Sequence, residues 1–384
     1  MNYEKPVERP EIGRFFGFHH LVYWVGNAKQ AAAFYTTRFG FEYLAYRGLE
    51  TGERQVASHV VKKNDVLFEF QSPYHADDQL GMNAHISKHG DGVRDVAFTV
   101  EDCAHTFEVA VKRGAKVVRE VEKLSDQDGE VVVATVQTYG DTTHTFVERK
   151  NYKGAFLPGY HKHLMTEPIN EVLEAVEFQF VDHVVGNQAV GDMEPTASWY
   201  EKVLDFHRFW SVDDKIIHTD YSSLNSVVMA DFDESIKMPI NEPANGKRKS
   251  QIQEYVDYYH GAGVQHIALN TQDIISVVTN LRKRGVEFLT VPDSYYDNLR
   301  KNLPKANIEV KENLDTLQQL KILIDYDDKG YLLQLFTKPV EDRPTLFFEF
   351  IQRNNHAGFG AGNFRALFKA IEDEQEKRGN LTMT

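Results

Sequence analysis

A single carboxylate, Glu349, lies within an otherwise apolar run of the sequence, LFFEFI at residues 346–351. The run has the length and the turn residues on either side that indicate a buried strand. An ionised carboxylate is seldom left alone in such surroundings, because removing an isolated charge from water costs far more than one strand gains by packing. Glu349 is therefore expected to face a cation.

Two histidines lie on short apolar runs of the same kind. His183 is in FQFVDHVVGN and His266 is in GAGVQHIALN, and both runs are strand-like. Two histidines and one carboxylate on separate strands form the facial triad that holds non-haem Fe(II) and leaves coordination positions open. The residue types therefore predict a metal site made of His183, His266 and Glu349.

An arrangement without metal is also compatible with these residues. A strand histidine is often a hydrogen-bonded core residue, and Glu349 has a partner of opposite charge four positions later in Arg353. The chain has 16 histidines, so two that suit a triad are easily found. The choice depends on whether the three side chains converge.

The length and charge of the chain limit its classes of function. At 384 residues, it is about twice as long as a typical domain, which favours two modules. It carries 57 acidic and 43 basic residues, with a net charge of −14. Such an acidic surface disfavours nucleic acid and anionic membranes as partners.

Sequence features also indicate a compartment. The one cysteine, Cys103, excludes an intrachain disulfide and fits a reducing environment. The first 18 residues contain no apolar core of signal-peptide length, and no run approaches the roughly 18 apolar residues of a spanning helix. We therefore expect a cytoplasmic protein without a membrane span.

Apolar periodicity and turn residues predict the elements of the first half. Strands are predicted at 18–27, 42–48, 66–70, 90–102, 131–138 and 143–150, and helices at 28–41 and 104–118. The polar stretch 51–59 is expected to join two of these strands. The same order of elements then returns in the second half, which indicates an internal duplication.

The duplication is clearest between residues 90–118 and 261–289. Gly, Val, Ala, Asp, Arg and Gly recur there at the same offsets. Aligning the two halves pairs His20 with His183, Asp95 with His266, and Glu148 with Glu349. Because the first half has no second histidine, only the second half is expected to bind the metal.

Domain boundaries follow from the repeat. We predict an N-terminal domain at 12–150 without a metal site, a connection at 151–178 that matches no repeat element, and a C-terminal catalytic domain at 179–384. Residues 363–379 have apolar side chains at helical spacing, which predicts an amphipathic helix. This helix either packs on the sheet or closes the site, with three preceding glycines as joints.

Long stretches of the chain resemble the 4-hydroxyphenylpyruvate dioxygenases, specifically the animal members of that family. The resemblance extends from about residue 12 to residue 380 and includes WVGNAKQAA, TYGDTTHTFVE, GAGVQHIAL, DRPTLFFEFIQR and GFGAGNF. It implies an α+β fold of the vicinal oxygen chelate type, with two domains of paired βαβββ modules. The C-terminal domain would form an open barrel around the metal, closed by the C-terminal helix.

The resemblance also implies a site and a reaction. The metal is Fe(II), held by His183, His266 and Glu349. Catalytic glutamines fall on Gln251 and Gln334, and the substrate pocket falls on Ser226, Pro239, Asn241, Gln265, Phe336, Phe347, Phe359 and Phe364. The implied reaction converts 4-hydroxyphenylpyruvate and O2 to homogentisate and CO2 in tyrosine and phenylalanine breakdown, and the implied assembly is a homodimer.

One of these positions conflicts with strand geometry. Gln265 directly precedes His266, and neighbouring side chains of a regular strand point to opposite faces. Gln265 is therefore expected to point away from the metal unless a β-bulge redirects it.

Three other functions fit the same residues. Hydroxymandelate synthase resembles this chain and acts on the same substrate with the same triad. A ring-cleaving catechol dioxygenase shares the fold and triad, and a duplicated binding module could have lost catalysis altogether. The product, the turnover of catechols and the metal content distinguish these alternatives.

Overall fold

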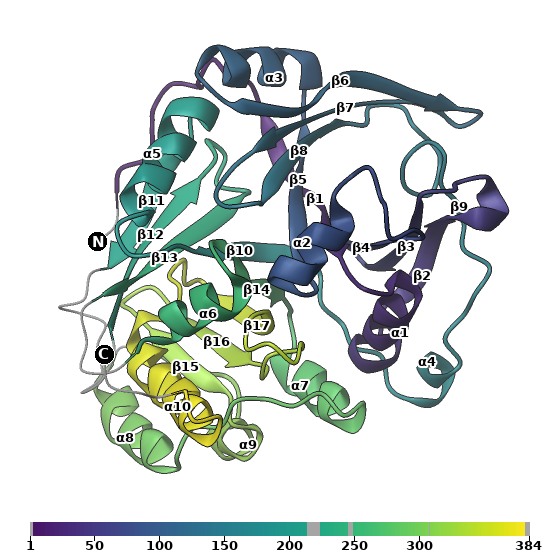
Figure 1. The fold of residues 1–384 in the computed structure, drawn as a ribbon. Helices are drawn as coiled ribbons and strands as arrows, with labels where there is room; N and C mark the ends of the chain where they lie inside the picture. Colours follow the sequence, from purple (N-terminus) through teal and green to yellow (C-terminus); the bar gives the residue numbers. More distant parts are fainter. Residues whose placement is uncertain (1–2, 213–222, 245–248, 307, 381–384) are drawn as a thin grey trace.

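The computed structural model describes residues 3–212, 223–244, 249–306 and 308–380, which form two curled mixed sheets with helices around them (Figure 1). The first sheet has the strand order β6-β7-β8-β5-β1-β4-β3-β2-β9, and the second has the order β11-β12-β13-β10-β14-β17-β16-β15. Both sheets are open, because their outermost strands are not paired with each other.

In the first half, the strands are β1 Phe15–Trp24, β2 Glu42–Arg47, β3 Val56–Lys63, β4 Val66–Pro73, β5 Gly92–Val100, β6 Lys116–Asp126, β7 Gly129–Gln137, β8 Thr143–Glu148 and β9 His161–Lys162. The helices are α1 Ala28–Phe39, α2 Met82–His89, α3 Cys103–Lys112 and α4 Ile169–Val172.

In the second half, the strands are β10 Val181–Asn187, β11 His207–Val212, β12 Ser223–Ala230, β13 Lys237–Ala244, β14 Gly263–Asn270, β15 Leu323–Tyr326, β16 Tyr331–Phe336 and β17 Phe347–Asn354. The helices are α5 Met193–Leu204, α6 Gln251–Tyr259, α7 Ile274–Lys283, α8 Ser294–Asn302, α9 Leu314–Leu320 and α10 Phe364–Lys377. Each half therefore contains two βαβββ modules, and the predicted α+β fold is confirmed.

Local sequence signals explain how the modules begin. The side chain of Asn27 accepts a hydrogen bond from the backbone N–H of Gln30 and caps α1. Gly40 then ends this helix with a left-handed φ of 73°, a conformation that favours glycine. The predicted helix boundary at Gly40 is confirmed.

Two local predictions are wrong, and one helix was not predicted. The polar stretch 51–59 does not merely join strands, because its end belongs to β3, which pairs along its length with β2 and β4. Pairing on both sides gives β3 its backbone hydrogen bonds whatever the polarity of its side chains. Residues 116–118 belong to β6 and not to a helix, since Gly114 at φ 101° ends α3. Helix α2 had no predicted counterpart.

The sheet register confirms two of the three aligned pairs and corrects the third. In the first half, His20 lies opposite Ala97, which is two positions after Asp95. In the second half, His183 lies opposite Ala268, which is two positions after His266. The alignment of Glu148 with Glu349, however, is wrong. The last strands instead pair Asp95 with Thr143 and His266 with Phe347, which places Thr145 at the position of Glu349.

A hydrogen bond identifies the true counterpart of Glu148. Its carboxylate accepts from the backbone N–H of Cys103 at 2.9 Å, at the start of α3. The Gln352 side chain accepts in the same way from Ile274 at 2.9 Å, at the start of α7. Glu148 therefore fixes a helix start and is no remnant of a metal ligand.

The two halves pack against each other reciprocally. On β17, Phe348 points away from the candidate site and contacts the rings of Tyr35 and Phe39 on α1, at centroid distances of 5.7 and 5.0 Å. On the other side, the hydroxyl of Tyr200 on α5 lies 2.7 Å from Nε2 of His144 on β8. Each half thus covers the outer face of the other half's sheet, and one apolar core extends through both.

The connection between the halves fills the inner face of the first sheet. Phe156 is buried and packs edge-on against His20 at 4.9 Å, and the hydroxyl of Tyr160 donates to Glu69. The short strand β9 also extends this sheet by pairing with β2. The position equivalent to the metal site is consequently occupied by side chains in the first half.

Among the described residues, no helix is both long enough and apolar enough to cross a membrane.

Candidate active site

Three neighbouring strands of the second sheet bring the predicted metal ligands together. Strand β14 pairs antiparallel with β10 and parallel with β17. Ala268 on β14 lies directly opposite both His183 and Glu349, and His266 precedes it by two positions. Since side chains at alternate positions share a face, all three ligands point to the inner face of the sheet.

The ligand atoms converge. Nε2 of His183 lies 3.1 Å from Oε2 of Glu349, and Nε2 of His266 lies 3.4 Å from the same oxygen. His183 and Glu349 are buried, at 2% and 3% exposure. The other carboxylate oxygen of Glu349, Oε1, is buried without a hydrogen-bond partner. The side chains therefore point toward one centre and leave an acceptor atom unsatisfied there.

A second layer of side chains fixes the orientation of both imidazoles. Nδ1 of His183 lies 2.8 Å from Oδ1 of Asp182, and Nδ1 of His266 lies 3.0 Å from Oε1 of Gln265. Both partners are acceptors, so each histidine carries its proton on Nδ1 and presents the lone pair of Nε2 to the centre. Metal-ligating histidines are oriented in this way.

Arg353 completes this second layer. Its guanidinium forms two hydrogen bonds to Asp182, at 2.7 and 2.8 Å. The alternative pairing of Arg353 with Glu349 is therefore wrong: Arg353 neutralises Asp182 and leaves Glu349 to the histidines. Asp182 was not singled out from the sequence, although a carboxylate directly before a candidate histidine was an available signal.

The electrostatics of the centre fit a bound cation. Burial alone would raise the pKa of Glu349, but the adjacent His183 and His266 hold that pKa below its ordinary value. Burial would lower the pKa of His183, but Glu349 and Asp182 raise it above its ordinary value. A positive charge is therefore favoured between Nε2 and the carboxylate, and either a proton or a metal ion can supply it. Two nitrogens and a carboxylate are also donors suited to a divalent transition metal. The residues present therefore fit a metal centre.

A bulge resolves the conflict at Gln265. Along the β10–β14 pair, Val185 lies opposite His266, but the next residue, Gly186, lies opposite Val264. Gln265 is therefore an extra residue in its strand, and the alternation of side chains is interrupted there. Its side chain lines the same cavity as His266. The expectation that Gln265 points away is wrong for this reason.

One cavity contains nearly all of the predicted site residues. It is lined by His183, Ser226, Pro239, Asn241, Gln251, Gln265, His266, Phe336, Phe347, Glu349, Phe359 and Phe364. Residues not singled out from the sequence complete the wall, namely Val185, Trp210, Leu224, Val228, Leu367 and Phe368. Most of these are plain apolar residues, and no local pattern separated them from core residues.

Gln334 is the predicted site residue that does not line this cavity. It is fully buried on β16, and both polar atoms of its amide are without hydrogen-bond partners. Gly360 lies directly against it, with a left-handed φ of 76° and no room for a Cβ, which would come within 2.1 Å of Oε1. The amide lies behind the glycine-rich segment, on the same strand face as Phe336.

Two helices position the mouth of the cavity. Ser250 caps α6 by accepting from the N–H of Gln253 at 3.2 Å, which places Gln251 at the first turn. Gln251 then accepts from the side-chain amide of Gln265 at 2.9 Å. Helix α10 lies beside α6 (Figure 1), and its Phe368 packs with Leu224 and Ile252.

The cavity has little free space in this arrangement. Its free volume is about 50 Å³, well below the roughly 300 Å³ at the lower end of ligand pockets. Phe364, Leu367 and Phe368 of α10 form one of its walls. Entry of a substrate with an aromatic ring therefore requires α10 or the segment before it to move.

Comparison with known proteins agrees with this geometry. A profile of the Glyoxalase/Bleomycin resistance protein/Dioxygenase superfamily matches residues 17–148 and 180–335. A 4-hydroxyphenylpyruvate dioxygenase of Tetrahymena thermophila is 62% identical over 384 residues, covering 99% of this chain and 95% of that protein. One of Xenopus tropicalis is 60% identical and covers 100% and 97%. The chain belongs to the 4-hydroxyphenylpyruvate dioxygenase family.

A solved structure shares the same architecture. A triple mutant of 4-hydroxymandelate synthase from Streptomyces coelicolor superimposes with a TM-score of 0.80 over 94% of this chain and 98% of that chain, at 29% identity. This identity is about half of that to the 4-hydroxyphenylpyruvate dioxygenases. The family assignment and the two-sheet fold therefore agree, and the sequence favours the dioxygenases.

We predict that His183→Ala and Glu349→Ala each remove Fe(II) from this site, because either change takes away one of its three protein ligands. Affinity for Fe(II) is expected to fall at least ~100-fold, which is the largest loss that usually follows mutation of a residue hydrogen-bonded to a metal ligand. Iron content after anaerobic loading measures this. Asp95→Asn, at the position equivalent to His266 in the first half, is the control and should retain full iron. Full iron in Glu349→Ala would contradict the ligand assignment.

We also predict that Asp182→Asn weakens Fe(II) binding by roughly 10–100-fold while the protein stays folded. The asparagine can present its amide N–H₂ to Nδ1 of His183, which would no longer hold the proton there. A competition titration with a chromophoric chelator gives the affinity. Asp192→Asn changes an exposed carboxylate that caps nothing at α5 and should match the wild type. Equal affinities in both variants would show that Asp182 does not orient the ligand.

Proposed function

We propose that this protein is an Fe(II)-dependent dioxygenase that converts 4-hydroxyphenylpyruvate and O2 to homogentisate and CO2. The observation that carries the proposal is the convergence of His183, His266 and Glu349 in a closed cavity of a chain from this family. The reaction belongs to tyrosine and phenylalanine breakdown. The protein's own part is to hold the metal, orient the substrate and exclude water.

Three protein ligands on one side of the metal leave the other side open for substrate. Bound Fe(II) supplies the site at which the 2-oxo acid and dioxygen react. Asp182 and Gln265 keep the Nε2 lone pairs of His183 and His266 directed at that ion, through their contacts with Nδ1. The geometry of the ligands is therefore fixed before substrate enters.

The remaining cavity residues fall into aromatic and polar groups, which would contact different parts of a 2-oxo acid that carries a phenol ring. Phe336 and Phe347 contact His266 with ring centroids at 6.0 and 4.8 Å, so they would hold the aromatic ring beside the metal. Gln251 and Gln265, joined by their amides, offer uncharged hydrogen bonds to the phenol hydroxyl. Ser226 and Asn241, opposite each other on β12 and β13, offer further polar contacts beside Pro239.

The closed cavity fits the need to exclude water. Phe359 lies 5.1 Å from the ring of His183, and Phe364 begins α10. Gln334 supports the segment between them from behind, against Gly360. We assign α10 the role of a closing helix, because its apolar side chains form the wall that would otherwise be open to solvent.

We further propose the larger organisation. Residues 179–384 form the catalytic domain, 151–178 the connection and 12–150 a domain without a metal site. The enzyme acts as a cytoplasmic homodimer, and exposed Leu164 and Val172 of the connection offer apolar surface for a partner chain. Light scattering of the purified protein and cell fractionation test these two points.

The reaction is tested by oxygen consumption with 4-hydroxyphenylpyruvate, with and without added ferrous iron, and by identification of the product. We expect consumption that requires iron and yields homogentisate. Formation of 4-hydroxymandelate without homogentisate would assign the chain to hydroxymandelate synthesis. Ring-opened product from catechols would indicate a ring-cleaving enzyme, and a protein that neither takes up iron nor consumes oxygen would be a binding module.

Closure by α10 is tested at its C-terminal end. Arg378 pairs with the buried carboxylate of Glu254 on α6 at 2.8 Å. Arg378→Gln leaves that charge without its guanidinium, so α10 should dock less tightly and water should reach the site. We expect the ratio of CO2 released to homogentisate formed to rise above one.

The neighbouring Lys377 provides the control. Its exposed side chain pairs only with Glu374 on the same helix, and such surface pairs contribute little. Lys377→Gln should therefore keep the wild-type ratio. If Arg378→Gln also keeps it, α10 is a fixed wall and does not close the site.

A further inference from the structure

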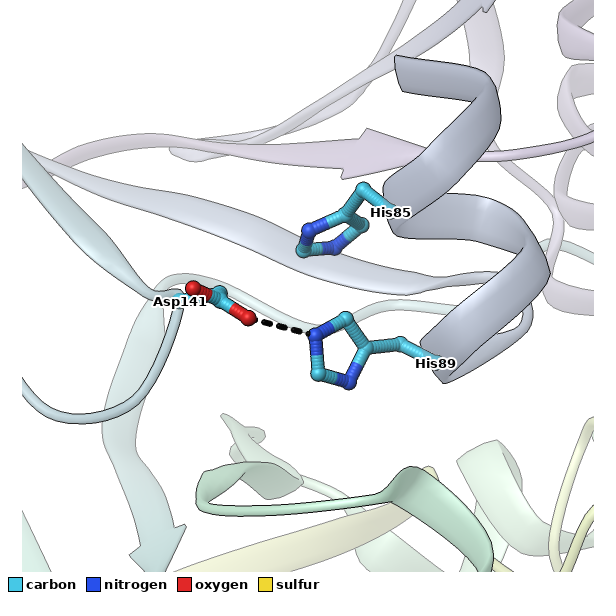
Figure 2. Close-up of side chains that lie close together, drawn as sticks. All are labelled: His85, His89 and Asp141. Carbon is cyan, nitrogen blue, oxygen red and sulfur yellow. Dashed lines mark hydrogen bonds and ion pairs between the residues drawn. The ribbon is translucent and has the colours of Figure 1, made fainter. Parts of the chain in front are cut away.

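A second group of metal-ligating side chains lies on the first half, outside the catalytic cavity. His85 and His89 project from α2 toward Asp141, which lies in the turn between β7 and β8 (Figure 2). One ligand atom of each lies within 4.8 Å of the others. The two histidines are four positions apart, which places them on one face of the helix.

His89 is oriented as metal-ligating histidines are. Its Nδ1 lies 2.5 Å from the backbone carbonyl of Tyr259, which can only accept, so Nδ1 carries a proton. Its Nε2 lies 2.8 Å from Oδ2 of Asp141, which also only accepts. Nε2 must therefore carry a second proton in a buried ring or share a cation with Asp141. The ring is fixed by stacking on Tyr259 at 4.4 Å.

His85 presents an unused nitrogen to the same place. Its Nε2 is buried and has no hydrogen-bond partner, and its ring contacts that of His89 at a centroid distance of 4.4 Å. A buried imidazole nitrogen that has no partner among the described residues is a donor atom available to a metal ion.

Asp141 supplies the negative charge. Its Oδ2 lies 2.9 Å from Nζ of Lys88 and 2.8 Å from Nε2 of His89. Donors of one tetrahedral zinc ion lie roughly 3.3–3.6 Å apart, given bonds of about 2.0–2.2 Å. Asp141 is on a turn with its side chain 42% exposed, so it can make the small rotation that this spacing requires.

We propose that His85, His89 and Asp141 bind a zinc ion, with water as the fourth ligand. Two imidazoles and a carboxylate match the donors of Zn²⁺, whereas Mg²⁺ and Ca²⁺ prefer oxygen. The positively charged Lys88 and Arg94 face the same site, and Lys88 competes for Asp141 at 2.9 Å. Binding is consequently weaker than in a site free of cations.

The ion would join three parts of the fold. It links α2 to the turn between β7 and β8, and through Nδ1 of His89 it reaches the end of α6 at Tyr259. The first residue of α6 is Gln251, which lines the catalytic cavity. The zinc site is therefore structural and stabilises the junction between the first half and α6.

The test counts zinc ions on the metal-free full-length protein by titration against a chromophoric chelator. The wild type should bind two Zn²⁺ per chain, one at this site and one at the catalytic ligands. His85→Gln and Glu349→Ala should each bind one, and the double variant none. The ion retained by Glu349→Ala should raise its melting temperature, and His85→Gln combined with Glu349→Ala should show no rise.

Two further variants make the result specific. His75→Gln changes an exposed histidine near α2 and should keep both ions. Lys88→Gln frees Asp141 and should tighten zinc binding at this site several-fold in the Glu349→Ala background. If Glu349→Ala binds no zinc, or if His85→Gln keeps two ions, the proposal is overturned and the cluster is an ion-pair network around His89.

Discussion

The buried carboxylate of Glu349 sets the constraint on which the catalytic half depends. A charge at 3% exposure among phenylalanines is stable only if a positive partner shares its surroundings. Arg353, the nearest strong cation in sequence, is occupied by Asp182. His183 and His266, oriented by Asp182 and Gln265, direct their Nε2 atoms at the carboxylate. A metal ion satisfies all three groups at once, so the geometry that buries Glu349 is also the geometry that creates a catalytic centre.

The same scaffold is used differently in the first half. Asp95 and Thr145 occupy the positions of His266 and Glu349, and Phe156 and Tyr160 of the connection fill the inner face. Burial raises the pKa of Asp95 to about 6, and the hydroxyl of Thr143 donates to its Oδ1 at 2.5 Å. Helix α1 of the first half packs on the second sheet, and α5 of the second half packs on the first sheet. The first half therefore contributes packing to the half that contains the candidate site.

The active cavity is small and lined mostly by apolar side chains. In the first half the connection fills the inner face of the sheet, whereas the second sheet keeps that face for the cavity. Helix α10 covers that face with apolar side chains and is held to α6 by the Arg378–Glu254 pair. In the described part of the chain, Glu254 on α6 accepts from both Arg378 and Asn380 at 2.8 Å, so polar contacts at the end of α10 add to its apolar packing.

The sequence by itself determined the order of strands and helices and the duplication, and it predicted the three candidate ligands, since apolar periodicity, glycine register and a charge in an apolar run are local signals. Only the tertiary structure decided the rest. A one-residue bulge directs the side chain of Gln265 toward the cavity. The register of β8 shows that Glu148 is not equivalent to Glu349. Arg353 forms its ion pair with Asp182. These outcomes depend on which strands become neighbours and on where an extra residue is absorbed. The side-chain types along a single strand specify neither its neighbours nor the position of a bulge. The cluster of His85, His89 and Asp141 likewise depends on which segments become neighbours in the fold.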